Sequence, residues 1–251
     1  MKNQSETAQD YRLTASLERM LASFGALGAE DLAHIRSGFD SASQIHAAGA
    51  PVTLLPERNE ARLVVRGWVA RGATLEDGRR QIVGLSLPGD VIVASGAVDV
   101  DMIVWTLTDA ETTDASAFWN AMSAPTAQSL PLLEAWRRFQ AAERLRLARQ
   151  VIRLGRLNAY ERTAHLLLEL HERQSRLEAA GAGQLHLPLT QDVLADILGL
   201  SAVHMNRTLQ QLRRSALVDY RAGKTALPDL PGLAQAAGLS AESWPSQGNR
   251  G

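Results

Sequence analysis

The chain is 251 residues long, with 45% hydrophobic and 21% charged residues, which is an ordinary composition for a globular protein. It has no apolar run near the ~20 residues that a membrane span requires, and its first residues lack the apolar core of a signal peptide. The absence of cysteine excludes disulfides, cysteine-ligated iron–sulfur clusters and thiolate zinc sites. We therefore expect a soluble cytoplasmic protein, with two modest domains as the first expectation.

The net charge of −1 conceals an uneven distribution of charge along the chain. Residues 131–230 hold 15 Arg and Lys against 10 Asp and Glu, so this part carries +5 and the rest of the chain carries −6. Such an excess favours an anionic partner for the C-terminal half. Basic helices with solvated faces give the same count, so charge alone leaves both interpretations open.

The first 130 residues change from a helical pattern to a strand pattern. Residues 1–11 are polar and have no periodicity, so we expect them to be disordered. Residues 13–39 have helical spacing, with a Gly-Ala-Glu-Asp start signal before the second part. Residues 44–116 contain seven or eight short apolar segments, with a hairpin turn signal at Glu76–Arg80. This pattern predicts a β-sandwich or a rolled barrel.

A helical pattern begins at Pro131 and predicts one long helix over residues 131–157. One apolar stripe has heptad spacing and small residues that allow close approach, and it consists of Ala141, Leu145, Ala148 and Ile152. A second stripe further around the helix consists of Leu147, Val151 and Leu154. Two apolar faces require two partners, so we expect one to be the β domain and the other a second copy of the helix, in a homodimer. The alternative is that both stripes serve one intramolecular core.

The segment from Asn158 to Gly181 predicts another helix. Asn158 with Glu161 three positions later forms a capping-box-like start. The core face is supplied by Leu166, Leu167 and Leu170. Gly181 and Gly183 end the helix, and GQLHLPL at residues 183–189 predicts a short strand.

The sequence TQDVLADILGLSAVHMNRTLQQLRR, at Thr190–Arg214, has the pattern of a helix-turn-helix. Thr190 is a good N-cap for a short helix, Gly199 supplies the positive φ of a tight turn, and Ser201 caps a second helix. The inward positions of the second helix are Met205, Leu209 and Leu212. In this motif the first helix braces the second, which presents its outer face to a major groove.

The outer face of the second helix is rich in hydrogen-bond donors. It carries Val203, Arg207, Gln210 and Arg214, with His204 and Asn206 on its flanks. We predict base readout by His204, Asn206 and Arg207. The strand–turn–strand pattern that follows predicts a wing whose basic tip contacts the sugar-phosphate backbone. The predicted DNA-backbone contacts are Thr190, Ser201, Gln210, Arg213, Arg214, Arg221 and Lys224.

Together these motifs resemble the Crp/Fnr family of bacterial transcription regulators. The most specific parts are NAYERTAHLLLEL, LPLTQDVLADILGLSAVHMNRTLQQLRR and the strand segment DGRRQIVGLSLPGD. The resemblance implies an α+β fold, with N-terminal helices and a cyclic-nucleotide-binding-like β-roll in residues 1–130, a dimerisation helix at 131–157 and a winged helix-turn-helix with a C-terminal extension in 158–251. It also implies a homodimer that binds double-stranded DNA at a palindromic operator, with RNA polymerase as a candidate further partner.

The chain departs from the family pattern in its ligand and operator residues. Members that bind cyclic nucleotides hold the phosphate with an arginine of the roll, whereas this chain has no arginine between Arg80 and Arg137. A buried phosphate would lack a compensating cation, so we expect no dependence on cyclic AMP. Oxygen-sensing members need cysteines, which are absent. The early Arg-Glu pair of the recognition helix is replaced by Ala202 and Val203, and only Arg207 matches, so we expect a different operator.

No enzymatic activity, metal site or cofactor is expected. The six histidines are scattered, and His165 and His171 share a predicted helix at a spacing that points them in different directions. The sequence has no Gly-rich phosphate loop, nucleophile elbow or paired acid motif. The competing hypothesis is a small-molecule sensor or protein-interaction module in which the helix-turn-helix has no DNA role.

Overall fold

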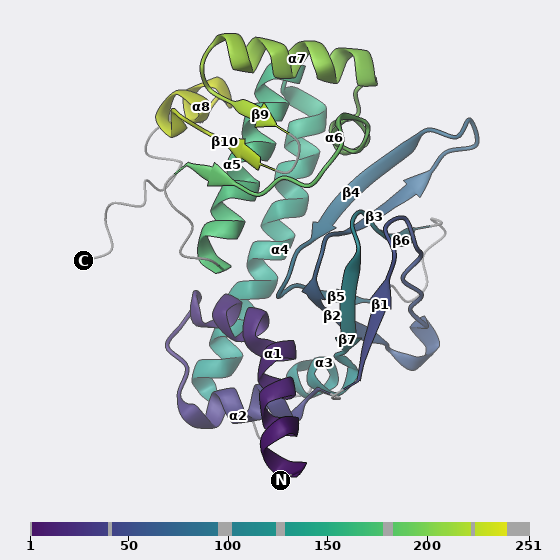
Figure 1. Cartoon of the computed structure of the whole chain (residues 1–251), viewed down its shortest axis with the longest axis vertical. Coiled ribbons are helices and arrows are strands. Elements are labelled where there is room, and N and C mark those ends of the chain that lie inside the picture. The colour runs from purple at the N-terminus through teal and green to yellow at the C-terminus, as the bar shows by residue number, and fades with distance from the viewer. Residues whose placement is uncertain are drawn as a thin grey trace. The chain divides into compact units, whose positions relative to one another are not determined.

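The computed structural model of this chain describes residues 2–39, 42–94, 102–123, 129–177, 183–221 and 224–239. Its contacts divide the chain into two compact units, Met1–Leu147 and Ala148–Gly251, and the division falls inside the long helix α4. The first unit contains helices and two antiparallel sheets, and the second contains helices and one antiparallel sheet (Figure 1). In the part of the chain that the structure describes, helices long and apolar enough to cross a membrane are absent.

Two helices, α1 (Lys2–Ala22) and α2 (Ala29–Ser37), begin the first unit. The prediction that residues 1–11 are disordered is wrong from residue 2 onward, because α1 begins at Lys2. This stretch contains no glycine or proline, so nothing in it stops a helix that the apolar residues further along stabilise. The buried face of α1 consists of Leu13, Leu17, Met20 and Leu21. Arg36 on α2 forms an ion pair with Glu18 on α1 at 2.9 Å.

Seven strands in the described residues form the β-roll, in agreement with the predicted seven or eight. They are β1 (Ser43–His46), β2 (Ala61–Arg66), β3 (Val69–Thr74), β4 (Arg80–Ser86), β5 (Val91–Val93), β6 (Ile103–Thr106) and β7 (Ala110–Asp114), with a 3₁₀ turn at Pro56–Arg58. One antiparallel sheet has the order β1-β7-β2-β5 and the other has the order β4-β3-β6 (Figure 1). A core cluster of the roll consists of Val52, Val64, Val69, Ile92 and Ala110. The predicted hairpin turn is confirmed between β3 and β4.

An aromatic cluster joins the start of α4 (Leu130–Arg156) to α3 (Ser116–Ser123), a short helix that the sequence analysis did not predict. Trp136 on α4 lies edge-on to Phe118 on α3, with ring centroids 5.2 Å apart, and it also stacks on Phe139. Burial of these rings fixes the first turns of α4 within the first unit. The long helix that was predicted from Pro131 is confirmed, and its last residue is Arg156.

The second unit consists of the end of α4 and a set of short elements (Figure 1). They are α5 (Ala159–Leu177), β8 (Gln184–Leu185), α6 (Gln191–Leu198), α7 (Ala202–Arg214), β9 (Asp219–Arg221), β10 (Lys224–Ala226) and α8 (Leu230–Ala236). The three strands form a sheet of order β8-β10-β9, and α5 packs against α7 and α8. The capping box at Asn158 is confirmed, because its side chain accepts from the Glu161 N–H and the Glu161 carboxylate accepts from the Asn158 N–H.

The turn at Gly67, between β2 and β3, gives a stability prediction. Gly67 has φ +85°, and a Cβ there would lie 2.4 Å from the carbonyl oxygen of Asp109. Gly78, in the β3–β4 turn, has φ +83° but a Cβ there would have no neighbour within 4 Å. We expect Gly78→Ala to cost only the ~1–2 kcal/mol of a left-handed conformation, and Gly67→Ala to cost more because the backbone must also move.

Chemical unfolding of both variants, followed by tryptophan fluorescence, measures this difference, since Trp68 and Trp105 lie in the roll. Equal losses of unfolding free energy for Gly67→Ala and Gly78→Ala would show that the close approach at Gly67 is unimportant.

Candidate nucleic-acid interface

Side-chain caps and one glycine define the helix-turn-helix. The Thr190 hydroxyl accepts a hydrogen bond from the Val193 N–H at 3.3 Å, at the start of α6. The Ser201 hydroxyl accepts one from the His204 N–H at 3.2 Å, at the start of α7. Gly199, between the helices, has φ +63°. The two predicted N-caps and the predicted positive φ are therefore confirmed.

Helix α7 has one buried face and one exposed face. Its buried side chains are Met205, Thr208, Leu209 and Leu212, which include the three predicted inward positions. Its exposed side chains are Ala202, Val203, His204, Asn206, Arg207, Gln210, Gln211, Arg213 and Arg214. The helix contains no Asp or Glu, and its last turn carries two arginines. The structure thus brings the three predicted base-readout residues together on one exposed helix surface with a positive charge.

Some of these exposed residues form contacts within α7 or with the wing. The wing is the β9–β10 pair with the residues between its strands. Gln210 donates from Nε2 to Oδ1 of Asn206 at 3.3 Å. Arg213 donates from Nη2 to the Tyr220 carbonyl oxygen on β9 at 2.5 Å and lies 3.9 Å from the Asp219 carboxylate. A guanidinium carries five N–H donors, so these contacts leave others for a phosphate. The phosphate contact predicted for Arg213 stays a prediction.

The predicted wing is confirmed at the level of its backbone. In the antiparallel register of β9 and β10, Arg221 is the partner of Lys224, so the two predicted basic residues come together at the end of the hairpin. Residues 222–223 and the side chains of Arg221 and Lys224 lie outside the described part of the structure. The Tyr220 hydroxyl donates to the Leu189 carbonyl oxygen at 2.8 Å, which ties β9 to the segment before α6.

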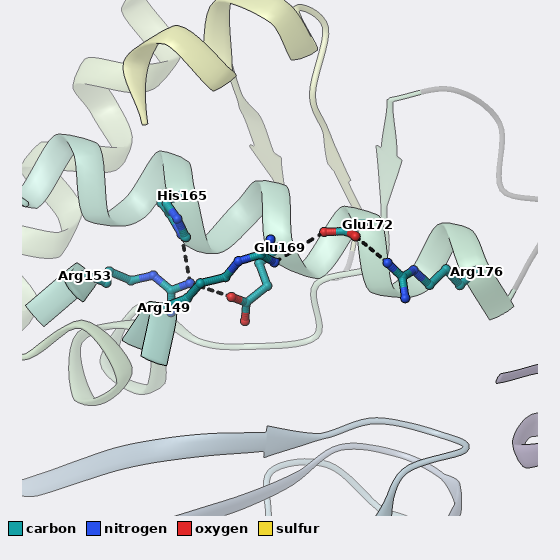
Figure 2. A network of polar contacts seen from close by, with 6 residues as sticks. All are labelled: Arg149, Arg153, His165, Glu169, Glu172 and Arg176. Carbon is teal, nitrogen blue, oxygen red and sulfur yellow. Dashed lines mark hydrogen bonds and ion pairs between the residues drawn. The ribbon is translucent and has the colours of Figure 1, made fainter. Parts of the chain in front are cut away.

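A buried ion pair joins the last turns of α4 to α5 (Figure 2). Arg153 is only 1% exposed and its Nη2 lies 2.8 Å from a carboxylate oxygen of Glu169, which is buried as well. The same nitrogen donates to Nδ1 of His165 at 3.0 Å, and Nη1 donates to Oε1 of Gln150. At the rim of this network, Glu172 pairs with Arg149 at 3.6 Å and with Arg176 at 2.6 Å (Figure 2).

Two of the last backbone carbonyls of α6 accept hydrogen bonds from side chains on the other helices. Gln150 on α4 donates from Nε2 to the Ile197 carbonyl oxygen at 2.6 Å. Arg162 on α5 donates from Nη1 to the Leu198 carbonyl oxygen at 3.0 Å. These carbonyls belong to a helix end, which leaves its last C=O groups without partners inside the helix. The residue after them is Gly199, so the contacts hold the segment that leads into α7.

Burial and the neighbouring guanidinium control the protonation of His165. Desolvation first, and then repulsion by Arg153, lower its pKa from the ordinary value of 6.5 to about 4. Arginine only donates hydrogen bonds, so Nδ1 of His165 must be an acceptor and the neutral ring carries its proton on Nε2. Desolvation also lowers the pKa of Arg153, against the attraction of Glu169.

The predicted dimerisation stripe on α4 is exposed to solvent in this chain. All four of its residues are exposed, with Leu145 at 51% and Ile152 at 56%. Leu147 and Val151 of the second stripe are exposed too. This exposure argues against the alternative that both stripes serve one intramolecular core. The buried residues of α4 lie before the stripes, at Leu132, Ala135, Trp136 and Phe139, or on the helix face between the stripes, at Gln150 and Arg153.

The network of Gln150, Arg153, His165 and Glu169 is not among the features predicted from the sequence. There the arginines of this region contribute only to net charge, and the leucines of α5 form the predicted packing face of that helix. One signal was present, because Arg153 follows Gln150 at a spacing of three and His165 precedes Glu169 at a spacing of four, so each pair shares a helix face. Nothing in the sequence shows that these two faces meet.

Residues 161–236 match the family model of the Crp-like helix-turn-helix domain. The chain is 33% identical over 161 residues to the transcriptional activator protein FnrL of Cereibacter sphaeroides, covering 62% of this chain and 63% of FnrL. It is 30% identical over 151 residues to the nitrogen fixation regulation protein FixK of Rhizobium meliloti, covering 60% and 65%. The chain therefore spans less than two thirds of these two relatives. For the transcriptional activatory protein AadR of Rhodopseudomonas palustris, identity is 28% over 217 residues, covering 84% and 87%.

Solved structures have the same fold. The structure of FixK2 from Bradyrhizobium japonicum matches with a TM-score of 0.65 at 24% identity, covering 80% of this chain and 98% of that one. TTHA1359, a transcriptional regulator of the CRP/FNR family from Thermus thermophilus, matches with a TM-score of 0.56 at 23% identity, covering 81% and 100%. The predicted α+β architecture of β-roll, long helix and C-terminal winged helix-turn-helix is confirmed.

The lowered pKa of His165 predicts a loss of stability in acid. Between pH 6.5 and about 4 the unfolded chain binds a proton at His165 and the folded chain does not, so the free energy of unfolding falls as the pH falls through this window. One such group gives a slope of at most ~1.4 kcal/mol per pH unit. The comparison is with His165→Asn, which keeps an acceptor near the position of Nδ1 but does not titrate.

Urea unfolding of both proteins at several pH values measures the difference. We expect the stability of the wild type relative to His165→Asn to decline between pH 6.5 and 4 and to be constant above pH 7. A difference that does not vary with pH would contradict the assignment of a neutral, buried His165.

Proposed function

We propose that this chain is a member of the Crp/Fnr family and a sequence-specific DNA-binding transcription regulator that acts as a homodimer in the cytoplasm. The observation that carries the proposal is the exposed face of α7, which is free of carboxylates and presents donor-rich side chains along its length. A helix of this kind fits the major groove of B-DNA, where base edges offer a distinct pattern of donors and acceptors. The proposal includes no enzymatic activity.

Base readout is assigned to the first half of α7. Arg207 has the fork geometry that binds the O6 and N7 atoms of guanine, and Asn206 has the amide that pairs with adenine. His204, one turn before Thr208, is exposed at the same end of the helix. Val203, which is 64% exposed, adds an apolar surface of the kind that contacts the methyl group of thymine.

Phosphate contacts are assigned to the residues around this centre. Arg213 and Arg214 lie in the last turn of α7, and Arg221 and Lys224 lie at the end of the wing. The Thr190 and Ser201 hydroxyls lie at the N-termini of α6 and α7, where backbone N–H groups also favour an anion. Gln210 completes the set of predicted backbone contacts. These groups position the protein and give affinity without sequence preference.

The homodimer is assigned to the exposed stripe of Ala141, Leu145, Ala148 and Ile152 on α4. Exposed Leu and Ile side chains at heptad spacing favour pairing with a second copy of the same helix. Two-fold symmetry then places two copies of α7 on a palindromic operator, about one turn of DNA apart. RNA polymerase is the further partner expected of a regulator that acts at promoters.

We infer that the regulator does not depend on cyclic AMP. No arginine or lysine lies between Arg80 and Arg137, so the later strands of the roll offer no cation for a cyclic phosphate. Residues 95–101 of this stretch lie outside the described part of the structure. The competing proposal is a small-molecule sensor or protein-interaction module without DNA binding. Such a protein would have no affinity for any DNA duplex, and this distinguishes it from the proposed regulator.

Duplex binding and its salt dependence test the proposed function. A duplex selected from a random library by the full-length protein serves as the probe, and fluorescence anisotropy gives the affinity. With 6–10 phosphate contacts, we expect affinity to fall by roughly 10³–10⁵ between 50 and 200 mM salt. Arg207→Ala is expected to cost ~1–3 kcal/mol and to relax the preference at one base position.

Lys224→Ala is the control for this change, because a phosphate contact weakens all sequences alike and lowers the salt slope by ~1. If Arg207→Ala leaves the affinity and preference for the selected duplex intact, the base-readout assignment is wrong. Absence of any duplex affinity at low salt favours the competing proposal.

A charge in the exposed stripe of α4 tests the homodimer. We expect Ile152→Glu to weaken the dimer by at least ~10-fold, because each copy loses an apolar contact and gains a buried charge. Sedimentation equilibrium of the full chain measures the change. Leu75→Glu, at an exposed leucine of the β3–β4 turn, is the matched control and is expected to leave the dimer intact. A wild-type chain that is monomeric at all concentrations contradicts the assignment.

A further inference from the structure

The ion pair of Arg153 and Glu169 occupies a position where apolar residues would serve stability at least as well. Both side chains are almost fully buried, and burial of a charged pair carries a desolvation penalty that its mutual attraction often does not exceed (Figure 2). Charge-assisted hydrogen bonds differ from apolar contacts in being directional, since the guanidinium fork satisfies its acceptors in only one orientation. The ion pair therefore contributes more to a defined orientation of α4 and α5 than to the free energy of unfolding.

This geometry extends from α4 to the start of the recognition helix. Arg153 donates to Oε1 of Gln150, and Gln150 in turn donates to the Ile197 carbonyl oxygen at the end of α6 at 2.6 Å. Only Leu198, Gly199, Leu200 and the cap Ser201 separate this carbonyl from α7. We call Gln150, Arg153 and Glu169 the joint.

The opposite face of the same turns of α4 is apolar and exposed. Gln150 and Arg153 are three positions apart and share one face of the helix. Val151 and Ile152, which lie between them in sequence, point away from that face and are 65% and 56% exposed. The turn from Gln150 to Arg153 therefore carries two joint residues on one side and, on the other, Ile152 of the proposed dimer interface and Val151 of the second stripe. The two sides are separated by no more than the width of the helix.

We propose that the joint sets the half-site spacing that this protein recognises on DNA, with Gln150, Arg153 and Glu169 acting as positioning residues. This inference rests on the proposed function. When two copies pair through α4, the joint fixes the orientation of each helix-turn-helix relative to the end of its own α4. This orientation determines the distance and the rotation between the two copies of α7. A shift of one base pair changes both separation and rotation along the duplex, so a fixed orientation selects one spacing.

The test replaces the polar side chains of the joint with apolar side chains of similar volume. Arg153→Met with Glu169→Leu substitutes apolar side chains for the ion pair, and such replacements of buried pairs commonly preserve the fold. Gln150→Leu removes the contact to α6 and leaves the ion pair in place. Glu134→Gln with Arg138→Gln neutralises an exposed ion pair on the same helix in the first unit and is the matched control.

The probes are duplexes that carry two copies of the half-site selected by the wild type, with the spacing changed in steps of one base pair, and a duplex with one half-site. For the wild type and the control we expect one preferred spacing, with affinity roughly tenfold lower two base pairs away. For the joint variants we expect this preference to shrink to about threefold or less, while affinity for the single half-site stays within about threefold of the wild type.

Circular dichroism and sedimentation first establish that each variant is folded and dimeric. A folded, dimeric joint variant with the spacing profile of the wild type overturns the proposal, and so does one that loses the single half-site as well, because the joint would then maintain the helix-turn-helix itself. If the double variant does not fold, Gln150→Leu decides on the same criteria. A wild-type protein that binds no duplex refutes the proposed function instead, so the two failures are distinguishable.

Discussion

A guanidinium that is almost wholly removed from solvent determines the geometry of the second unit. Arg153 keeps its proton at any ordinary pH, so its charge has to be neutralised where it lies. Glu169 supplies the opposite charge, and His165 and Gln150 supply acceptors. The hydrogen bonds among these side chains are directional, whereas the apolar contacts of the leucines of α5 are not. Within the second unit, the end of α4 and the helix α5 therefore have one well-defined mutual orientation, and α6 is attached to both.

The features that could be predicted from sequence depend on residues within a few positions of each other. A cap at Thr190 or Ser201 acts on N–H groups two or three residues away, and Gly199 serves a local change of φ. The capping box at Asn158 has the same range. Because the helix-turn-helix is a sequence of such local signals, its boundaries and its outer face could be placed without a structure. The strands of the roll followed from their spacing, but the order of the strands within its two sheets did not.

What could not be predicted depends on contacts between distant segments. Arg153 and Glu169 are 16 positions apart, and burial of both became evident only when α4 and α5 were packed together. The helix α3 was missed because its stability comes from rings that it shares with α4, such as the contact of Phe118 with Trp136. The early start of α1 at Lys2 has a related cause, because a helix anchored by its later turns extends through polar residues that show no periodicity.

These contacts also change the meaning of the charge excess in residues 131–230. That excess favoured an anionic partner, yet Arg153 is neutralised inside the protein and Arg162 is bound to backbone carbonyls. Exposed arginines of this range lie on α4, at Arg137, Arg144 and Arg156, and on α7, where Arg207 and Arg214 share a helix that contains no carboxylate. The net charge of a segment therefore overstates the charge available to an anionic partner. The position of the exposed arginines on a helix without carboxylates supports the proposed DNA contact more directly than their number does.

The end of α4 reverses the usual order of a helix in a globular protein, with a charge inside and apolar side chains outside. Alone, this arrangement is unfavourable on both counts, since Arg153 is desolvated while Val151 and Ile152 contact water. Glu169 compensates the charge of Arg153 within the chain, and burial of Val151 and Ile152 against a second copy of the helix would offset the remaining cost. Dimer formation would then supply stability through the apolar face. The buried polar contacts would define the angle between α4 and α5. In the proposed homodimer, such a helix would combine an apolar face for pairing with a directional network for orientation, which suits it to hold two DNA-binding surfaces at a set distance.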